Sequence, residues 1–281
     1  MKFFSLHGGH SNLSHGKGDP EEFVEAAISK GMNGIGFSDH MLKTEKDCYI
    51  YNGERNSVGL KKFPKYLQEI RRLKRKYSSK IKILLGFEVD YFPDEEKYIR
   101  DFIAKYTFDY LVGSVHFVNG IPIDQDYETY DTAVNSCGGL LDFYIQYYKT
   151  VQKMIRMKCF QVIGHIDIVK IFNRKNNPES LRLKKIIYET LRLMRKYKCL
   201  LDVNVAGYIK PKGELYPNQE ILKMSKEAGV EVSYGDDSHD PKHVGRFFKR
   251  ALAEIQKAGY KKFSILKKKN RGEFLRKVGV F

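Results

Sequence analysis

Short apolar runs alternate with amphipathic stretches along almost the whole chain. The apolar runs are continuous rather than interrupted at every second position, which is typical of strands buried on both faces of a parallel sheet. We therefore predict seven strands, over residues 3–6, 34–38, 81–87, 108–115, 160–163, 199–203 and 230–234. A further short run at 264–266 is expected to form a last edge strand.

Between these runs, apolar residues recur at helical spacing and predict helices that cross from one strand to the next. The first helix is expected to begin at Asp19, a favourable N-cap, with Pro20 in its first turn, and to end at Gly31. Residues 41–59 are polar and contain glycine, so we expect a long loop there. Further helices are predicted over 63–73, 94–106, 130–158, 178–197, 217–228 and 241–258.

The order of strand followed by helix repeats seven times and favours one parallel sheet with helical crossovers. The pattern permits an open doubly wound sheet or a closed barrel. The length of 281 residues suits a single α/β barrel domain. The position of candidate chemistry along the strands decides between the two.

The histidines are placed unevenly on this pattern. Five end or directly follow a predicted strand, two lie in the loop after the first strand, and only His243 falls in a helix start. Glu88 and Asp237 also stand at strand ends. The seven other histidines are His7, His10, His15, His40, His116, His165 and His239.

In a closed barrel the C-terminal ends of the strands meet on one face, where barrel enzymes hold their active sites. Any one of these histidines alone is best explained as a hydrogen-bonded strand-end residue. Together they predict a metal site, because neutral imidazoles are good metal ligands and protonated ones would repel one another. A mixed set of imidazoles and carboxylates suits zinc, manganese or iron and does not suit calcium.

The charge balance is strongly basic, with 50 Lys and Arg against 34 Asp and Glu and a formal net charge of +16. Such an excess suits attraction to nucleic acid or to a small phosphorylated substrate, and it also suits a solvated basic surface. The densest basic stretches, 71–76 and 261–277, lie on segments predicted as surface helices or near the chain end. We therefore favour the solvated surface.

Cysteine spacing and hydropathy indicate a cytoplasmic protein. The four cysteines, Cys48, Cys137, Cys159 and Cys199, form no CxxC pair and are expected to be reduced thiols. No apolar run approaches the roughly 18–20 residues of a membrane span. The first residues hold too short an apolar stretch for a signal peptide.

Seven blocks of sequence around the candidate ligands resemble the PHP (polymerase and histidinol phosphatase) superfamily, and its monofunctional histidinol-phosphate phosphatases in particular. The blocks occur in order over nearly the whole chain, which makes the resemblance far more specific than one histidine pair. They are HGGHS at 7–11, FSDH at 37–40, GFEVDY at 86–91, FDYLVGSVHF at 108–117 with PID at 122–124, IGHID at 163–167, DVNVAG at 202–207 with KPKGELYP at 210–217, and GDDSH at 235–239.

The resemblance implies an α/β fold, a single distorted (β/α)7 TIM-like barrel over residues 1–281, and three divalent metal ions, zinc, manganese or iron. It implies hydrolysis of L-histidinol phosphate to L-histidinol and phosphate, in histidine biosynthesis. Asp39 is expected to orient a ligating imidazole. The implied ligand sets are His7, His10, Glu88 and Asp237 for one metal, Glu88, His116 and His165 for a second, and His15, His40 and His239 for a third.

Candidate catalytic residues are Glu88, Asp237 and His239. Clustered metals would lower the pKa of a bridging water and neutralise charge on the phosphate during in-line attack. We expect Asp237, or water held at the metals, to give the leaving oxygen its proton.

The chain departs from the family in two places. The family usually has HxH in the first block, whereas this chain has HxxH, and residues three apart on a regular strand point to opposite faces. A bulge at Gly8–Gly9 would restore convergence, and otherwise only one of the two histidines would bind metal; we favour both binding. Ile209 also stands where an arginine is common, so phosphate recognition is expected from Lys170, Arg174 or Lys210, each of which could equally be a solvated surface charge.

Two other functions remain open from the sequence. One is a different phosphoesterase or a nuclease of the same superfamily, and the other is a related metal-free barrel that serves as an RNA-binding subunit. The complete ligand set argues against the second, and the blocks at 108–117 and 210–217 argue against a nuclease. We expect a small phosphate monoester as substrate and no membrane or nucleic-acid partner, and the oligomeric state stays open.

Overall fold

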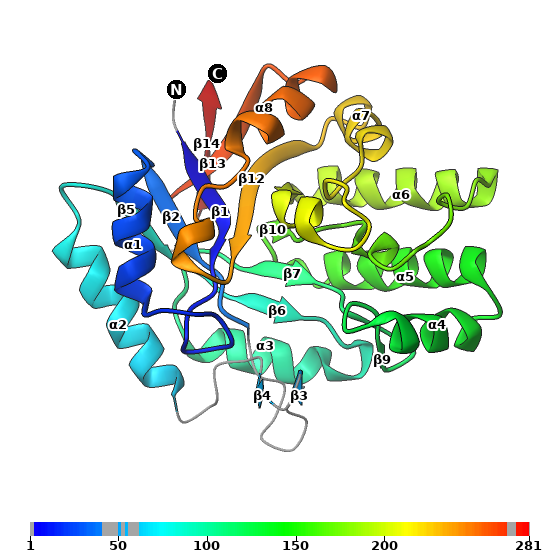
Figure 1. Cartoon of the computed structure of the whole chain (residues 1–281), viewed down its shortest axis with the longest axis horizontal. Coiled ribbons are helices and arrows are strands. Elements are labelled where there is room, and N and C mark those ends of the chain that lie inside the picture. Colours follow the sequence, from blue (N-terminus) through cyan, green and yellow to red (C-terminus); the bar gives the residue numbers. More distant parts are fainter. Residues whose placement is uncertain (1–2, 41–49, 52–53, 56–61, 269–273, 281) are drawn as a thin grey trace.

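Eight parallel strands form one curled sheet at the centre of the molecule (Figure 1). The computed structural model describes residues 3–40, 50–51, 54–55, 62–268 and 274–280. All seven predicted strands occur in this sheet. In sheet order its members are β5 (Lys82–Leu85), β2 (Gly34–Phe37), β1 (Phe4–Gly9), β12 (Glu231–Ser238), β11 (Leu200–Asn204), β10 (Val162–Ile163), β7 (Val112–Ser114) and β6 (Glu88–Asp90).

The two ends of the sheet are consecutive in the chain. β5 is the first strand in sheet order and β6 the last, and only Gly86 and Phe87 separate them. In this continuous segment β5 pairs with β2 and β6 pairs with β7. The sheet therefore closes into a barrel of seven strand positions, one of which β5 and β6 share. A parallel bridge between His40 and Glu88 links the same two sides. The predicted distorted (β/α)7 barrel is confirmed, and the open doubly wound sheet is not the fold.

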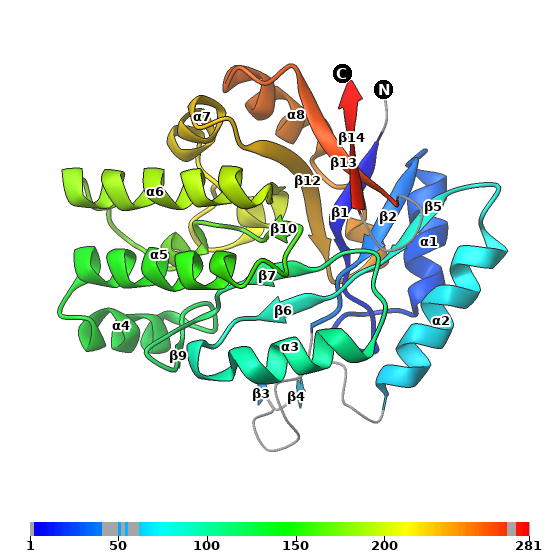
Figure 2. The same cartoon turned by 180° about the vertical axis from the view of Figure 1, so that it is seen from behind.

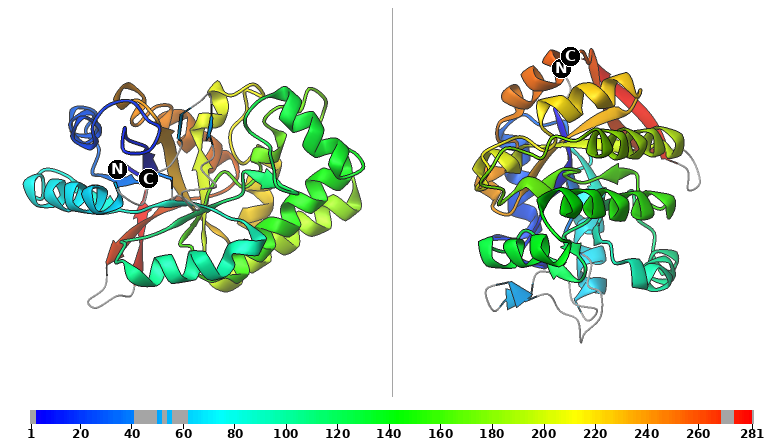
Figure 3. Two further views of the ribbon diagram at one scale, coloured as in Figure 1. Left: turned by 90° about the horizontal axis from the view of Figure 1, so that it is seen from below. Right: turned by 90° about the vertical axis from the view of Figure 1, so that its right-hand side faces the viewer.

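Helices surround the strands (Figures 2 and 3), with α5 packed beside α6 and α1 beside α2. Among the described residues, no helix has both the length and the apolar character needed to cross a membrane. The α-helices are α1 (Pro20–Ser29), α2 (Phe63–Lys76), α3 (Glu96–Lys105), α4 (Tyr127–Ser136), α5 (Leu140–Arg156), α6 (Leu181–Tyr197), α7 (Gln219–Glu227) and α8 (Phe248–Lys257). Short 3-10 turns are η1 (Pro93–Glu95), η2 (Ile168–Lys170), η3 (Val205–Ile209) and η4 (Pro241–His243).

Two predicted helices are each divided in the structure. The helix expected over 130–158 becomes α4 and α5, because Gly138 and Gly139 adopt φ of +82° and +129°, a backbone conformation that ends a helix. The helix expected over 241–258 becomes η4 and α8, and Gly245 and Phe247 have positive φ between them.

The predicted edge strand at 264–266 does not join the barrel sheet. It lies in β13 (Lys262–Lys268), which pairs antiparallel with β14 (Phe274–Val280), a strand that the sequence analysis did not predict. Two further hairpins pair β3 (Ile50–Tyr51) with β4 (Glu54–Arg55) and β8 (Phe117–Val118) with β9 (Ile121–Pro122). Apart from β3 and β4, the loop predicted over 41–59 lies outside the described residues.

Tyr110 fills the barrel interior beneath the ends of the first two strands. Its fully buried hydroxyl donates to the carbonyl oxygens of Leu6 and of Phe37, the latter at 3.1 Å. A Cβ atom on Gly36 would lie only 2.1 Å from this hydroxyl oxygen, so the strand must carry glycine there. The packing thus ties β1 and β2 together directly below the strand ends that carry the histidines.

Candidate metal centre

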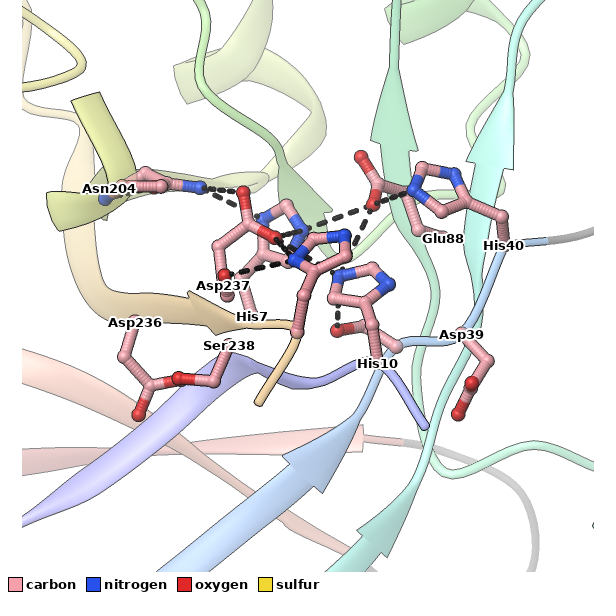
Figure 4. Close-up of polar contacts among 12 residues, drawn as sticks. His7, His10, Asp39, His40, Glu88, Asn204, Asp236, Asp237 and Ser238 are labelled. Atoms are coloured by element: carbon pink, nitrogen blue, oxygen red, sulfur yellow. Dashed lines mark hydrogen bonds and ion pairs between the residues drawn. The ribbon is translucent and has the colours of Figure 1, made fainter. Parts of the chain in front are cut away.

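The C-terminal ends of the barrel strands bring all nine predicted metal ligands to one place. Figure 4 labels His7, His10, His40, Glu88 and Asp237 among them. The rings of neighbouring histidines have centroids between 4.3 and 6.0 Å apart. His243 lies in η4, outside this cluster. The cluster consists of His7, His10 and His15 from β1 and its loop, His40 after β2, Glu88 in β6, His116 after β7, His165 after β10, and Asp237 and His239 at the end of β12.

The first histidine pair is brought together by an irregularity in β1. The register against β12 shifts between His7 and Gly9, and the register against β2 shifts between Ser5 and Gly9. A side chain on Gly8 would place its Cβ 2.3 Å from the carbonyl oxygen of Gly36, so this close approach requires glycine. As a result the imidazoles of His7 and His10 both face the cluster, although they stand three positions apart in the sequence (Figure 4).

Glu88 lies at the centre of the cluster and is 1% exposed. Its Oε2 is 3.1 Å from His7 Nε2 and 3.3 Å from His40 Nε2, and its Oε1 is 3.1 Å from His165 Nε2. Burial alone would raise the pKa of this carboxyl, but the imidazoles of His40 and His7 outweigh it and hold the pKa well below its ordinary value. Glu88 is therefore ionised and shared between several imidazoles.

Asp237 faces the other side of the same imidazoles. Its Oδ1 lies 3.1 Å from His10 Nε2 and 3.8 Å from His7 Nε2, while the Asn204 amide donates to its Oδ2 at 3.0 Å. Burial opposes ionisation of this carboxyl too, yet His7 and His10 hold its pKa well below the ordinary value. By contrast, burial and the nearby His10 and His15 hold the pKa of His239 well below that of a free imidazole.

The donor atoms form four overlapping groups of three within the described part of the chain. In each group the ligand atoms lie within 4.8 Å of one another. His15, which belongs to none of the four, has its ring 4.4 Å from that of His239 and 5.0 Å from that of His40. The groups are His7, His10 and Asp237; His7, Glu88 and His165; His40, Glu88 and His116; and His10, His40 and His239.

This donor set fits bound transition-metal cations. His116 Nε2 and His165 Nε2 face each other at 3.2 Å, and the rings of His10 and His239 are stacked with centroids 4.3 Å apart. Imidazole nitrogens gain little from facing one another, whereas a cation held by several of them and a carboxylate is favourable. The buried arrangement of like donors is what a cluster of divalent metals requires.

Three of the imidazoles are oriented by acceptors behind them. His7 Nδ1 donates to Asp202 Oδ2 at 2.7 Å, and His116 Nδ1 donates to Asp90. His239 Nδ1 donates to the carbonyl oxygen of Asp237 at 3.2 Å, because a carbonyl can only accept. Each of these bonds places the proton on Nδ1 and leaves the Nε2 lone pair for a metal.

Asp202 and Asp90 are functional residues that the sequence analysis missed. Asp90 stands two positions after Glu88 and therefore on the same face of the strand, which is a signal that could have found it. Asp202 begins the DVNVAG block, but no spacing links it to His7, which is 195 residues away. Only the closure of the barrel brings β11 and β1 close enough for this pair.

Asp39 holds the loop that follows β1. Its carboxylate accepts hydrogen bonds from the Ser11 amide at 2.7 Å, the Ser11 hydroxyl at 3.0 Å and the Ser14 hydroxyl at 2.6 Å. Burial raises the pKa of this carboxyl, and the nearby His10 imidazole and these hydrogen bonds oppose the shift. Asp39 therefore acts on the segment between His10 and His15 through these hydrogen bonds and on the His10 imidazole through its charge.

The three cations expected near a phosphate have different surroundings. Lys170 is 1% exposed, and its ammonium donates to Asp167 and to the Leu215 carbonyl oxygen, both at 2.7 Å. Arg174 is exposed and pairs with Asp131. Lys210 lies close enough to His239 to lower the pKa of that imidazole. Lys210 thus acts electrostatically on a histidine of the cluster, while Lys170 lies over the Tyr216 ring, which contacts His165.

Comparisons with known proteins agree with this geometry. The family described as the PHP domain matches residues 6–206. A Schizosaccharomyces pombe protein described as "Probable histidinol-phosphatase" is 30% identical over 90% of this chain and 86% of its own length. A protein of known structure from Listeria monocytogenes is 27% identical, with a TM-score of 0.81 over 88% of this chain and 99% of that one. Histidinol phosphate phosphatase from Lactococcus lactis, solved with zinc, L-histidinol and phosphate, is 24% identical, with a TM-score of 0.75 over 94% and 96% of the two chains.

Proposed function

The chain belongs to the PHP domain family, and from that premise we propose that it is a histidinol-phosphatase, a hydrolase that converts L-histidinol phosphate and water to L-histidinol and inorganic phosphate. This reaction is a step of histidine biosynthesis. The observation that carries the proposal is the convergence of seven histidines and two carboxylates at one mouth of the barrel. Relatives described as histidinol-phosphatases, similar over most of the chain, support the choice of substrate.

We propose that residues 1–281 act as one catalytic domain with three divalent metals, zinc, manganese or iron. When bound, such metals lower the pKa of water and neutralise charge on the phosphate oxygens during in-line attack. Glu88 is shared between two of the donor groups and would bridge two metals. The other ligands would be His7, His10 and Asp237 on one side, His116 and His165 on another, and His15, His40 and His239 at the mouth.

The protein's own groups supply the proton transfers. The pKa of Asp237 is held well below its ordinary value, so this carboxylate enters the reaction ionised. We propose that Asp237, or water held at the metals, takes the proton that the attacking water loses as the new P–O bond forms, and that a proton returns from there to the leaving oxygen as the P–O bond to histidinol breaks. Glu88 and His239 would have supporting roles at the same face as metal ligands, Glu88 as a carboxylate and His239 as a neutral imidazole.

Lys210 is the cation that we propose for phosphate recognition. Its link to His239 puts a positive charge beside the cluster, whereas the donors of Lys170 are taken by Asp167 and Leu215. Arg174 pairs with Asp131 and stacks over Tyr127. A cation next to the metals would hold the substrate's phosphate before attack and release it afterwards.

The test is hydrolysis of L-histidinol phosphate by the purified full chain, with phosphate release as the readout. We expect activity that a chelator removes and added divalent metal restores, and we expect Glu88→Ala and His116→Ala to lose both metal and activity. His243→Ala is the matched control, because it removes the histidine outside the cluster and should leave both unchanged. Activity that survives the chelator and both cluster substitutions contradicts the proposal, and faster hydrolysis of single-stranded DNA would favour a nuclease.

We also propose that the enzyme acts in the cytoplasm on a small soluble substrate. Cys137 and Cys159 are free thiols, as expected in a reducing compartment. Fractionation with detection of the tagged protein tests this, and recovery in a secreted fraction would contradict it.

A further inference from the structure

Asp237 has an uncommon backbone conformation for a residue with a side chain. Its φ is +46°, in the left-handed region that residues other than glycine rarely adopt. This conformation directs the carboxylate toward His10 and Asn204. Backbone conformations of this kind persist only when the surrounding structure holds them.

Arg246 supplies two contacts that hold this segment. Its Nε donates to the carbonyl oxygen of Asp236 at 3.1 Å, and its terminal Nη2 donates to the carbonyl oxygen of Asp237 at 3.1 Å. Arg246 is itself anchored, because its carbonyl oxygen accepts a 2.5 Å hydrogen bond from the Tyr234 hydroxyl. The preceding residue, Gly245, donates its amide to Asp236 Oδ2 at 2.6 Å.

The two acceptors belong to the two peptide planes that flank the Cα atom of Asp237. The Asp236 carbonyl lies in the plane before it, and the Asp237 carbonyl in the plane after it. Fixing both planes fixes φ and ψ of Asp237, and with them the direction of its Cα–Cβ bond. The guanidinium suits this task because its donors have a rigid planar arrangement.

We propose that Arg246 is a positioning residue of the metal centre, whose guanidinium holds both peptide planes around Asp237 and so aims the Asp237 carboxylate at the metal shared with His7 and His10. The inference rests on the proposed metal centre, but not on the identity of the substrate. Arg246 lies outside the seven sequence blocks, and its contacts go to main-chain oxygens, so no motif indicates this role. Lysine at 246 would keep the charge but reach only one of the two carbonyls.

The experiment compares full-length wild type, Arg246→Gln, Arg246→Lys and Arg250→Gln. Arg250 is the matched control, since it lies four positions after Arg246, in α8, and its guanidinium stacks 3.6 Å from the centroid of the Tyr208 ring instead of contacting the Asp236–Asp237 backbone. Metal-stripped protein is titrated with Zn²⁺ against a chromogenic chelator. We expect Arg246→Gln to weaken zinc binding by about 10–100-fold, as the loss of a residue supporting a ligand does. The zinc affinity of Arg246→Lys should lie between those of wild type and Arg246→Gln, and the zinc affinity of Arg250→Gln should match wild type.

A second readout needs neither metal nor activity. Amide hydrogen exchange of residues 235–240 in the metal-free protein should be faster in Arg246→Gln than in Arg250→Gln, while exchange in β11 stays unchanged. Equal zinc affinity and equal exchange in these two variants would overturn the inference. If Arg246→Gln does not fold, the zinc titration and the hydrogen exchange of Arg246→Lys test the inference instead. If wild type binds no Zn²⁺, the proposed function fails, and the exchange rates still decide whether Arg246 orders this segment.

Discussion

Two clusters of charged side chains in this molecule are built on opposite principles. On the surface between α1 and α2, the Glu21 carboxylate accepts from Arg72 at 2.5 Å, from Tyr77 at 2.7 Å and from Lys76. In the metal centre, imidazoles face imidazoles, as His116 and His165 do at 3.2 Å. In the surface cluster the carboxylate is neutralised by cationic side chains of the chain itself. In the metal centre the converging donors need bound metal cations to balance them.

The difference separates side chains that add a little to the stability of the fold from side chains that serve function. Exposed ion pairs such as those of Glu21 typically contribute no more than about 1 kcal/mol, because solvent screens them. Burying several imidazoles and carboxylates together costs free energy, and proteins keep such groups where a bound ligand offsets that cost. We therefore expect substitutions in the metal centre to change activity strongly and substitutions in the surface network to change little.

The largest effect is expected from Glu88→Gln. The substitution keeps the size of the side chain but removes the charge shared by the surrounding imidazoles. We expect turnover of histidinol phosphate to fall by about 10³-fold, a barrier increase of about 4 kcal/mol. Glu69→Gln in the surface network is the control and should keep wild-type turnover; equal turnover in the two variants would erase the distinction between the clusters.

A smaller loss is expected from Asp202→Asn. The amide still accepts from His7 Nδ1 but carries no charge to orient and polarise the imidazole. Zinc affinity or turnover should fall by about 10–100-fold. Asp101→Asn, on the exposed face of α3, provides the comparison. A wild-type zinc affinity for Asp202→Asn would show that acceptors behind the ligands are dispensable.

Gly36→Ala tests the packing beneath the metal centre rather than its chemistry. The new Cβ would lie 2.1 Å from the Tyr110 hydroxyl, so the free energy of unfolding in urea should drop by about 1–3 kcal/mol. Part of this loss should disappear when Gly36→Ala is combined with Tyr110→Phe, which removes the hydroxyl. Additive losses in the double variant would mean that the hydroxyl is not the obstacle.

The smallest effect is expected from Glu21→Gln. Hydrogen bonds from Lys76, Arg72 and Tyr77 lower the pKa of Glu21 from 4.5 to about 2. A lowered carboxyl pKa adds stability above the unfolded value, and this stability is lost as the pH falls from about 4.5 toward 2. At neutral pH the substitution should lower Tm by about 2 °C or less. The gap should close near pH 2, and a constant gap at all pH values would argue against the ion pairs as its cause.

Much of the fold was predictable because one physical signal was strong. Continuous apolar runs separated by helical periodicity predicted seven buried strands, and the strand-end histidines decided for a barrel. The breaks inside helices were harder to predict, since Gly138 and Gly139 end a helix through their backbone conformation and not through any change in apolar spacing. The second strand of the β13–β14 hairpin was missed because Arg276 and Lys277 interrupt its apolar residues.

The candidate metal ligands were predictable from the sequence, but the residues that orient them were not. Seven histidines and two carboxylates stand at strand ends or in the loop after the first strand, so nine candidate ligands could be named from the sequence. Asp202 and Arg246 act through contacts made only after the barrel closes, and each resembles an ordinary surface or core residue in the sequence. The convergence of His7 and His10 needed the strand irregularity at Gly8, which sequence allows but does not require.

Anomalous X-ray diffraction from crystals grown with zinc and phosphate tests the central claim most directly. We predict three anomalous peaks at the barrel mouth, each bordered by side chains among the nine converging ligands, with Glu88 between two of them. No peak at this mouth, or peaks only at other surfaces of the protein, would contradict the account.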